Sequence, residues 1–307
     1  MNPAFSVVLF TTIAGAAQGL VVALALATLS AIRMTSAFTG RSLVIAGVML
    51  AIGLVASFGH LGRKERAWRA VLMWRSSWLS RECIVLPLFI GWVVLWWWAL
   101  QRGEPHLLLP LLALLLAAAL WLCTGMIYAC LRFIEEWAQP LTLVNFVLIG
   151  LSSGFALASA LAAEAGQGEL LRASGPAALV LTLAAWAARM LSLRRNAALK
   201  HRSTLQSATG IRSPHLVQKA MGMTAGAFNT REFFHGRTLA LLRNVRRAFL
   251  LGGFVLPAVL MLAALLGAPA GLWWLAVASQ AAGLLAERWF FFAQARHPQN
   301  LYYQVVS

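Results

Sequence analysis

The chain has 307 residues, of which 61% are hydrophobic and only 11% are charged, and its mean hydropathy is +0.76. The core of a soluble protein cannot hold that much apolar sequence, so the composition predicts an integral membrane protein. The formal net charge is +16, with 25 Lys and Arg against nine acids; because the bases lie between long apolar runs, they indicate membrane topology rather than nucleic-acid binding.

Eight apolar runs have about the 20 residues that a membrane-spanning helix needs. They are residues 6–29, 42–60, 83–100, 107–131, 141–163, 176–193, 248–267 and 271–293. The runs are continuous rather than alternating, and a helix satisfies its own backbone hydrogen bonds in lipid, so they predict helices and not a barrel. We therefore expect an all-α integral membrane protein, with a single domain built as a bundle of eight transmembrane helices.

Glycine and proline mark several expected connections between these runs, among them Gly40, Pro140 and Gly175-Pro176. The turn at 267–270 is short, so the last two helices are expected to form an antiparallel hairpin. The first run follows no charged segment and precedes no small-residue cleavage site, which predicts that it belongs to the mature protein.

The basic residues are distributed unequally between the two sides of the expected bundle. Twenty of the 25 lie in the connections after the second, fourth and sixth helices or at the C-terminal end, and four lie on the opposite side. In multi-pass proteins the loops rich in Lys and Arg stay in the cytoplasm. The pattern therefore predicts an inner-membrane protein with both termini in the cytoplasm.

Two basic connections are predicted to face the cytoplasm. Residues 61–82, which we call the basic lid, carry six basic residues, and the long polar segment 194–247 carries eleven. The long segment is interpreted either as a solvated loop that enforces topology or as a docking surface for a peripheral partner. The aromatic residues in FNTREFFHG favour docking. The residues assigned to docking are Arg66, Arg69, Arg75, Arg231 and Arg237.

A histidine and a carboxylate flank the basic lid. His60 ends the second apolar run, and Glu82 is expected to open the third helix, with Ser80 as its N-cap. Ionisable residues at membrane depth are functional candidates, and the pKa of histidine, about 6.5, suits proton exchange at neutral pH. The plainer alternative is that each residue stabilises a helix end through the macrodipole. Together they are a candidate proton-handling pair for a small lipophilic redox carrier.

Other polar and reactive residues are interpreted as structural. Glu287 and Arg288, near the end of the last helix, are expected to form a structural ion pair. Cys83, Cys123 and Cys130 have no metal-binding or CxxC spacing, so they are expected to be small buried residues. Paired histidines at one depth on facing helices are lacking, as are P-loop and HExxH motifs, so neither a haem nor a metal is expected. Electrons must then come from a partner.

Four short motifs occur in order along the chain: HLG at 60–62, AWRA at 67–70, SWLSRE at 77–82, and WAQP at 137–140 with Tyr128 upstream. In this order they resemble the membrane anchor subunits of the dimethyl sulfoxide reductase family of molybdenum enzymes. The segment FNTREFFHGR and the ending AERWFFFAQARHPQNLYYQ resemble most closely the sulfite-oxidising branch of that family. The resemblance covers nearly the whole chain.

The resemblance implies a complex of three subunits. A molybdopterin catalytic subunit passes electrons through an iron–sulfur subunit to quinone, either ubiquinone or menaquinone, held by the anchor. The residues that match the family's quinone-associated histidine and carboxylate are His60 and Glu82, and Arg63, Arg81 and Tyr128 complete the candidate site. The anchor is expected to carry no haem, and molybdopterin and the iron–sulfur clusters are expected only in its partners. Cytoplasmic partners fit the sulfite-oxidising branch.

We therefore expect a quinone-reactive anchor, without catalysis at the molybdenum site, that serves sulfur respiration. His60 would hydrogen-bond a quinone carbonyl, and Glu82 would share the proton relay. One alternative is a purely structural anchor with the quinone bound mainly by the partner, and another is a quinol-oxidising anchor of a terminal reductase. A secondary transporter is disfavoured, because polar positions near the midplane such as Asn145 and Gln280 are too few for a transport site.

Overall fold

The structure is a computed structural model. It describes residues 3–59, 63–104, 106–200, 202–216 and 239–298, and all regular secondary structure in these ranges is helical. The all-α class predicted from composition is confirmed for this part of the chain.

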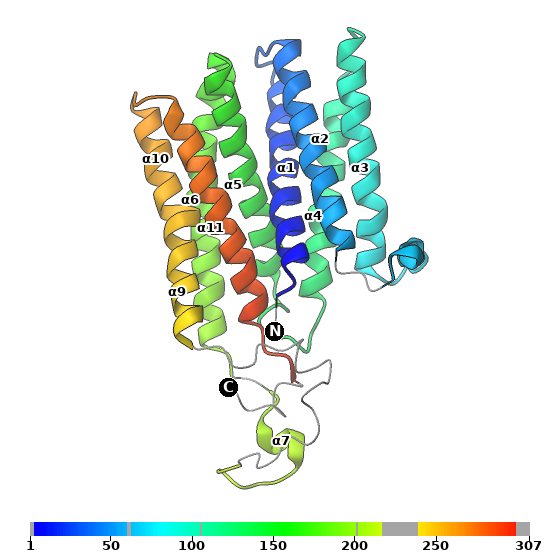
Figure 1. Cartoon of the computed structure of the whole chain (residues 1–307), viewed down its shortest axis with the longest axis vertical. Coiled ribbons are helices and arrows are strands. Elements are labelled where there is room, and N and C mark those ends of the chain that lie inside the picture. The colour runs from blue at the N-terminus through cyan, green and yellow to red at the C-terminus, as the bar shows by residue number, and fades with distance from the viewer. Residues whose placement is uncertain (1–2, 60–62, 105, 201, 217–238, 299–307) are drawn as a thin grey trace.

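Long helices stand side by side along one axis (Figure 1). They are α1 (Phe5–Leu29), α2 (Ser36–Phe58), α3 (Trp78–Gln101), α4 (Leu108–Ala129), α5 (Pro140–Glu164), α6 (Gly168–Ala197) and α11 (Gly271–Ala293). A further rod, Leu239–Leu265, consists of α9 (Leu239–Leu250), the π-helix η2 (Leu251–Val255) and α10 (Leu256–Leu265). The beginning of α1, the α4–α5 connection and the end of α11 lie at the same end of the bundle, which we call the lid end.

Among the described residues, seven helices are long and apolar enough to cross a membrane, and α11 is not one of them. It has 23 residues, but Gln280, Glu287 and Arg288 lower its mean hydropathy. All three side chains are buried, and α11 packs against α1, α5, α9 and α10. The eighth expected span therefore coincides with a helix whose polar residues face its neighbours rather than lipid.

The third helix begins earlier than expected. Ser77, and not Ser80, is its N-cap, because the Ser77 hydroxyl accepts a hydrogen bond from the Ser80 amide. Glu82 is therefore the fifth residue of α3 rather than its first, about 6 Å along the helix axis. The Ser80 prediction was wrong because polar residues in this turn face the bundle: Ser80 and Glu82 are both buried.

Three further boundaries differ from the prediction. α2 begins at Ser36, so Gly40, which was expected in a connection, lies inside the helix. α6 continues through Gly175-Pro176, and the turn before it lies at 165–167, where Gly166 has a φ of +65°. A proline is tolerated inside a membrane helix where neighbouring helices compensate the lost hydrogen bond. Residues 239–247, expected in the polar loop, belong to α9. Exposed Arg243, and Arg247 in the last turn of α9, can extend toward the interface while the helix continues.

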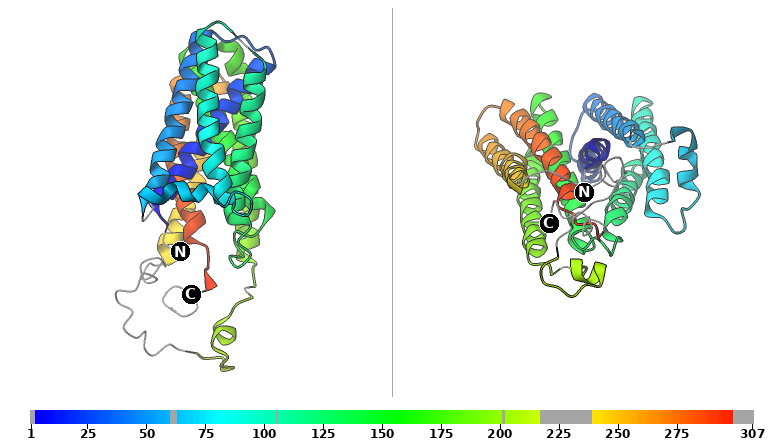
Figure 2. Two further views of the ribbon diagram at one scale, coloured as in Figure 1. Left: turned by 90° about the vertical axis from the view of Figure 1, so that its right-hand side faces the viewer. Right: turned by 60° about the horizontal axis from the view of Figure 1, so that its bottom comes forward.

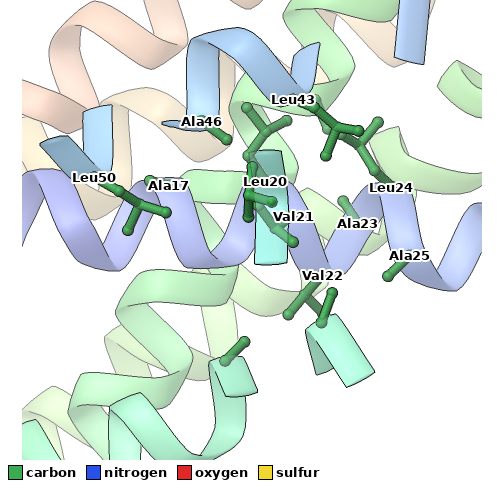
Figure 3. Packing of buried hydrophobic residues seen from close by; sticks show 14 of the residues in the cluster. Ala17, Leu20, Val21, Val22, Ala23, Leu24, Ala25, Leu43, Ala46 and Leu50 are labelled. Carbon is green, nitrogen blue, oxygen red and sulfur yellow. The ribbon is translucent and has the colours of Figure 1, made fainter. Parts of the chain in front are cut away.

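α1 is the central helix and packs against α2, α4, α5 and α11 (Figure 2). Figure 3 shows the apolar contact with α2, in which the participating side chains are Ala17, Leu20, Leu24, Leu43, Ala46 and Leu50. Glycines bring α1 close to α5: a Cβ at Gly154 would overlap backbone atoms of Gly19 and Leu20. Small residues permit such close helix crossings in membranes.

The described part of the basic lid lies beside the bundle. It contains the 3₁₀ helix η1 (Lys64–Val71), which projects sideways next to the beginning of α3 (Figures 1 and 2). Several large side chains of the lid are exposed, among them Trp68, Leu72, Met73 and Trp74. Arginine residues lie between these apolar residues, so the lid combines positive charge with aromatic surface.

Candidate functional site

Glu82 is the buried carboxylate of the candidate site. Its side chain is 6% exposed and accepts a hydrogen bond from the hydroxyl of Thr124 on α4. α3 and α4 are neighbours in the bundle, and this packing brings the two residues together from 42 positions apart. An ionisable group held at this depth costs free energy, which makes Glu82 a functional candidate.

His60 lies outside the described residues, and nothing in the structure tests its predicted role. The described chain reaches Gly59 after the end of α2 and resumes at Arg63. Both residues belong to the connection at the lid end, where Glu82 lies in the second turn of α3. Arg63 is exposed and precedes η1 as its N-cap residue.

Arg81, next to Glu82 in sequence, is bonded to the lid. Its Nε donates to the Trp74 carbonyl oxygen over 2.9 Å, and its Nη2 donates to the Arg75 carbonyl oxygen over 2.8 Å. The guanidinium also lies 4.2 Å from the centre of the Trp78 ring, within the range of a cation–π contact. Arg81 therefore fastens the end of the lid to the first turn of α3.

The arginines assigned to docking are exposed on the lid where the structure describes them. Arg69 lies over the Trp68 ring and Arg75 over the Trp74 ring, and Arg66 is exposed beside them. Arg231 and Arg237 lie outside the described residues.

Tyr128, near the end of α4, belongs to an aromatic cluster at the lid end. Its ring stacks on Phe146 at 5.6 Å and meets Trp137, Phe291 and Phe292 edge-on. Trp137 is held in place because its Nε1 donates to the Phe291 carbonyl oxygen over 3.0 Å. The cluster brings together residues of α4, α5, α11 and the α4–α5 connection.

A small cavity lies behind Thr124, between α1, α4, α5 and α11. Its walls include Thr11, Trp121, Thr124, Gly150 and Arg288. Only about 10 Å³ of it can hold the centre of a water molecule, which is room for about one water and too little for a quinone ring. The buried Trp121 Nε1, which lines the cavity, has no hydrogen-bond partner among the described residues.

Three charged residues are buried together where Arg288 forms part of the cavity wall. Arg189 Nε on α6 lies 2.8 Å from Glu287 Oε1 on α11, and Arg288 Nε lies 3.6 Å from Glu287 Oε2. All three are at most 3% exposed. Arg288 also lies 3.9 Å from the centre of the Phe146 ring. Glu287 is thus closer to an arginine on another helix than to its sequence neighbour Arg288.

The structure brings several predicted site residues near one another and adds others. Glu82 meets Thr124, which shares the cavity with Arg288, while Tyr128 follows Thr124 by one turn on the same helix. Thr124, Trp121 and Arg189 were not recognised as site residues. Their signal in the sequence is slight: each is an isolated polar or amphipathic residue within an apolar run.

The described residues contain no group of three or more His, Cys, Asp or Glu that could hold a metal ion. Cys123 is buried and Cys83 is partly buried. The expectation that all three cysteines are buried is wrong for Cys130, which is exposed because it lies at the C-terminal cap of α4.

Two larger clefts lie elsewhere on the bundle. One of about 240 Å³ lies between α2 and α3, with a lining of apolar residues that includes Leu43, Val93 and Trp97. The other, about 350 Å³, lies beside Arg33 and His106 at the end opposite the lid, remote from Glu82.

Comparison with known proteins adds evidence from the whole sequence. A family model described as DMSO reductase anchor subunit (DmsC) matches residues 1–264. The chain is also 47% identical to a protein of Allochromatium vinosum that is named as a subunit of sulfite dehydrogenase, over an alignment of 326 positions that covers the whole of both chains.

Proposed function

The chain belongs to the family of DMSO reductase anchor subunits (DmsC), and on that premise we propose that it is the quinone-reactive anchor of a molybdopterin and iron–sulfur oxidoreductase. It is a multi-pass membrane protein, and its family supplies the membrane subunit of multi-subunit complexes. The full-length similarity to a sulfite dehydrogenase subunit supports sulfite as the substrate of the catalytic partner. The observation that carries the quinone assignment is the buried Glu82–Thr124 pair next to the basic lid.

The residues around Glu82 fit one side of a quinone site. A buried carboxylate oriented by a hydroxyl can exchange a proton with a quinone oxygen, and the apolar cleft between α2 and α3 suits an isoprenoid tail. Bound quinone would supply the two-electron, two-proton redox chemistry that the chain itself lacks. The cavity behind Thr124 is too small for the ring, so the ring would lie on the lid side of Glu82, where His60 would complete the site.

The lid has the surface of a docking site for the iron–sulfur subunit. Arg66, Arg69 and Arg75 are exposed and would pair with acidic groups on the partner, and Trp68 and Trp74 would supply apolar contact. Arg231 and Arg237, outside the described residues, are proposed to extend this surface. Docking at the lid would bring the partner's electron donor near Glu82.

In the proposed topology the chain crosses the inner membrane eight times, and both termini lie in the cytoplasm. Twenty of the 25 basic residues fall in the connections at the lid end or in the C-terminal part of the chain, which supports cytoplasmic placement of that end. α11 would be the eighth span, with Glu287 and Arg288 shielded from lipid by their neighbours. The catalytic partners would then lie in the cytoplasm.

The first test is His60→Ala in the purified three-subunit complex. We expect quinone-coupled turnover to fall by about 100-fold, because a proton-handling hydrogen bond to the quinone is lost. Turnover with an artificial electron acceptor that bypasses the membrane subunit should stay unchanged. His106→Ala, at the opposite end of the bundle, is the control and should leave both activities unchanged.

The same experiment separates the alternatives. Unchanged quinone turnover in His60→Ala would favour the structural anchor, with quinone held mainly by the partner. Faster turnover of the unmodified complex with quinol as electron donor than with quinone as electron acceptor would favour the anchor of a terminal reductase. Failure of any partner to co-purify with the unmodified chain would contradict the anchor assignment itself.

A further inference from the structure

Buried and partly buried polar residues follow one another at regular spacing along the helices α5, α6 and α11. On α6, Thr182, Arg189 and Asn196 are seven residues apart, and Ser192 lies between the last two. On α11, Gln280 and Glu287 have the same spacing, as do Asn145 and Ser152 on α5. Because seven residues make about two helical turns, each set lies on one face of its helix. We call these residues the polar seam.

The seam consists of cross-helix contacts at successive depths. Gln280 Nε2 donates to Ser152 Oγ over 2.7 Å, and the Ser152 and Thr182 hydroxyls lie 2.9 Å apart. Nearer the lid end comes the pair of Arg189 and Glu287, at 2.8 Å. Asn145 and Gln280, which are too few for a transport site, are both bonded to polar residues of neighbouring helices.

Toward the lid end the seam reaches the surface. Asn145 Nδ2 donates to Ser192 Oγ over 2.7 Å, and Gln139 Nε2 donates to Asn196 Oδ1 over 3.3 Å. Arg195 Nη1 contacts the same Asn196 oxygen over 3.1 Å. Exposure increases along this line, from buried Ser192 to partly exposed Asn196 and Arg195.

Hydrogen bonds between helices commonly serve as structural contacts in membranes. The seam would need no other role if each of its polar atoms had a hydrogen-bond partner, but several have none. Buried polar atoms without a hydrogen-bond partner among the described residues recur along the seam, and they are Arg189 Nη2, Glu287 Oε2, Asn145 Oδ1, Gln139 Oε1, Asn196 Nδ2 and Gln280 Oε1. Buried polar groups in proteins are normally satisfied, if necessary by ordered water. The unmatched atoms therefore indicate bound waters along the seam.

The seam also connects to Glu82. Arg288, 3.6 Å from Glu287, lines the cavity behind Thr124, and the Thr124 hydroxyl donates to Glu82. The cavity has room for about one water and contains the unmatched Trp121 Nε1. Polar groups thus lead from Glu82 through one water-sized cavity to Arg288 and Glu287, and the further polar pairs of the seam lie on the same helices toward the surface near Asn196.

We propose that this line of residues is a hydrated proton path that connects Glu82, through Thr124, the cavity, Glu287 and the Asn145–Ser192 pair, to water at the lid end. The proposal rests on the proposed function, in which Glu82 exchanges protons with quinone. There, two electrons from the iron–sulfur partner and two protons from water convert the two carbonyls of a quinone to the two hydroxyls of a quinol. The path carries those protons inward, or outward when the reaction runs in reverse.

Two matched substitutions separate a path from a set of structural contacts. Asn145→Leu and Gln280→Leu each replace a buried amide of the seam by an apolar side chain. Asn145 lies between Glu287 and the surface, whereas Gln280 lies beyond Glu287, away from the proposed path. In the three-subunit complex we expect Asn145→Leu to slow quinone turnover and coupled proton exchange by about tenfold and to raise the solvent isotope effect. Gln280→Leu should match the unmodified complex in all three measurements.

A smaller pair of changes keeps the test decisive if Asn145→Leu does not assemble. Ser192→Ala and Ser159→Ala each remove one hydroxyl that is bonded across the α5–α6 interface, and only Ser192 lies on the path. Ser192→Ala should slow turnover several-fold, and Ser159→Ala should not. A readout independent of turnover is ordered water in an experimental structure of the complex, within hydrogen-bond distance of Trp121 Nε1, Asn145 Oδ1 and Arg189 Nη2.

Different results would contradict the proposed proton path and the proposed quinone site. If Glu82→Gln stops quinone turnover while the Asn145 and Ser192 variants match their controls and no water is found, the path is overturned and the quinone site stands. If Glu82→Gln leaves quinone turnover intact, Glu82 does not exchange protons with quinone and the proposed function is wrong. Ordered water along the seam would then not serve quinone chemistry.

Discussion

Replacing Glu82 by Gln is expected to lower quinone-coupled turnover of the complex by about 100-fold, the usual scale for loss of a positioned acid–base group. The amide can still accept the hydrogen bond from Thr124, so the substitution removes proton exchange while it preserves shape. Steady-state assays with a soluble quinone analogue and with an artificial acceptor on the same preparation would measure the effect. Only the quinone assay should change.

The lid supplies a matched control for this experiment. Glu65→Gln makes the same chemical change in an exposed residue of η1 and should leave quinone turnover within about twofold of the unmodified complex. Thr124→Val, which removes the hydroxyl that orients Glu82, should produce a smaller loss than Glu82→Gln. Equal turnover of Glu82→Gln and Glu65→Gln would contradict the assignment of Glu82 as a proton-exchanging group.

Gly154→Ala is expected to destabilise the bundle by about 3 kcal/mol or more, because the added methyl group meets backbone and not a movable side chain. A Cβ at this position would overlap Gly19 and Leu20 of the central helix, so α1 and α5 would have to separate. The thermal unfolding midpoint of the detergent-solubilised protein and its yield in membranes would both fall.

Gly91→Ala is the control for Gly154→Ala. Gly91 lies in the middle of α3, is exposed on the bundle, and a Cβ there would meet nothing within 4 Å. Since alanine favours a helix more than glycine does, this change should be neutral or slightly stabilising. Similar unfolding midpoints for the two variants would show that the α1–α5 crossing is less tight than described.

Replacing Arg189 alone, by Leu, should also destabilise the protein, by about 3–5 kcal/mol, because the Glu287 carboxylate would lose its nearest partner inside the bundle. The double change Arg189→Leu with Glu287→Leu removes both charges and should recover most of that loss. Thermal unfolding of the two variants measures the difference, and equal midpoints would indicate that Arg288 alone can compensate Glu287.

The sequence alone was sufficient for the helical class and for most of the helix positions. Long apolar runs predict membrane helices because backbone hydrogen bonds in lipid must be satisfied within the segment, whatever its neighbours are. This local requirement explains the close agreement for α1, α4, α5 and α11. The resemblance to the DMSO reductase anchor family also came from sequence motifs and was confirmed by whole-chain comparison.

Boundaries failed where a polar residue or proline lies inside a helix and is stabilised by another helix. Gly175-Pro176 was expected in the connection before the sixth helix, yet it lies inside α6, where Gly175 packs closely against Leu265 and Trp273 of the neighbouring helices. Ser80 was expected to precede α3, yet it is buried inside the first turn. In each case the sequence shows a residue that favours a helix end, while the neighbour that permits the helix to continue is far away in the chain.

The pairing of functional side chains was decided by tertiary structure alone. The sequence identifies Glu82 and Glu287 as charges in apolar surroundings, but it does not reveal that Thr124 donates to the first or that Arg189 lies beside the second. Those pairs depend on which helix faces meet, and the close α1–α5 crossing at Gly19 and Gly154 contributes to that arrangement. Hydropathy is a property of each segment, whereas a proton path requires polar atoms of different segments at matching depths.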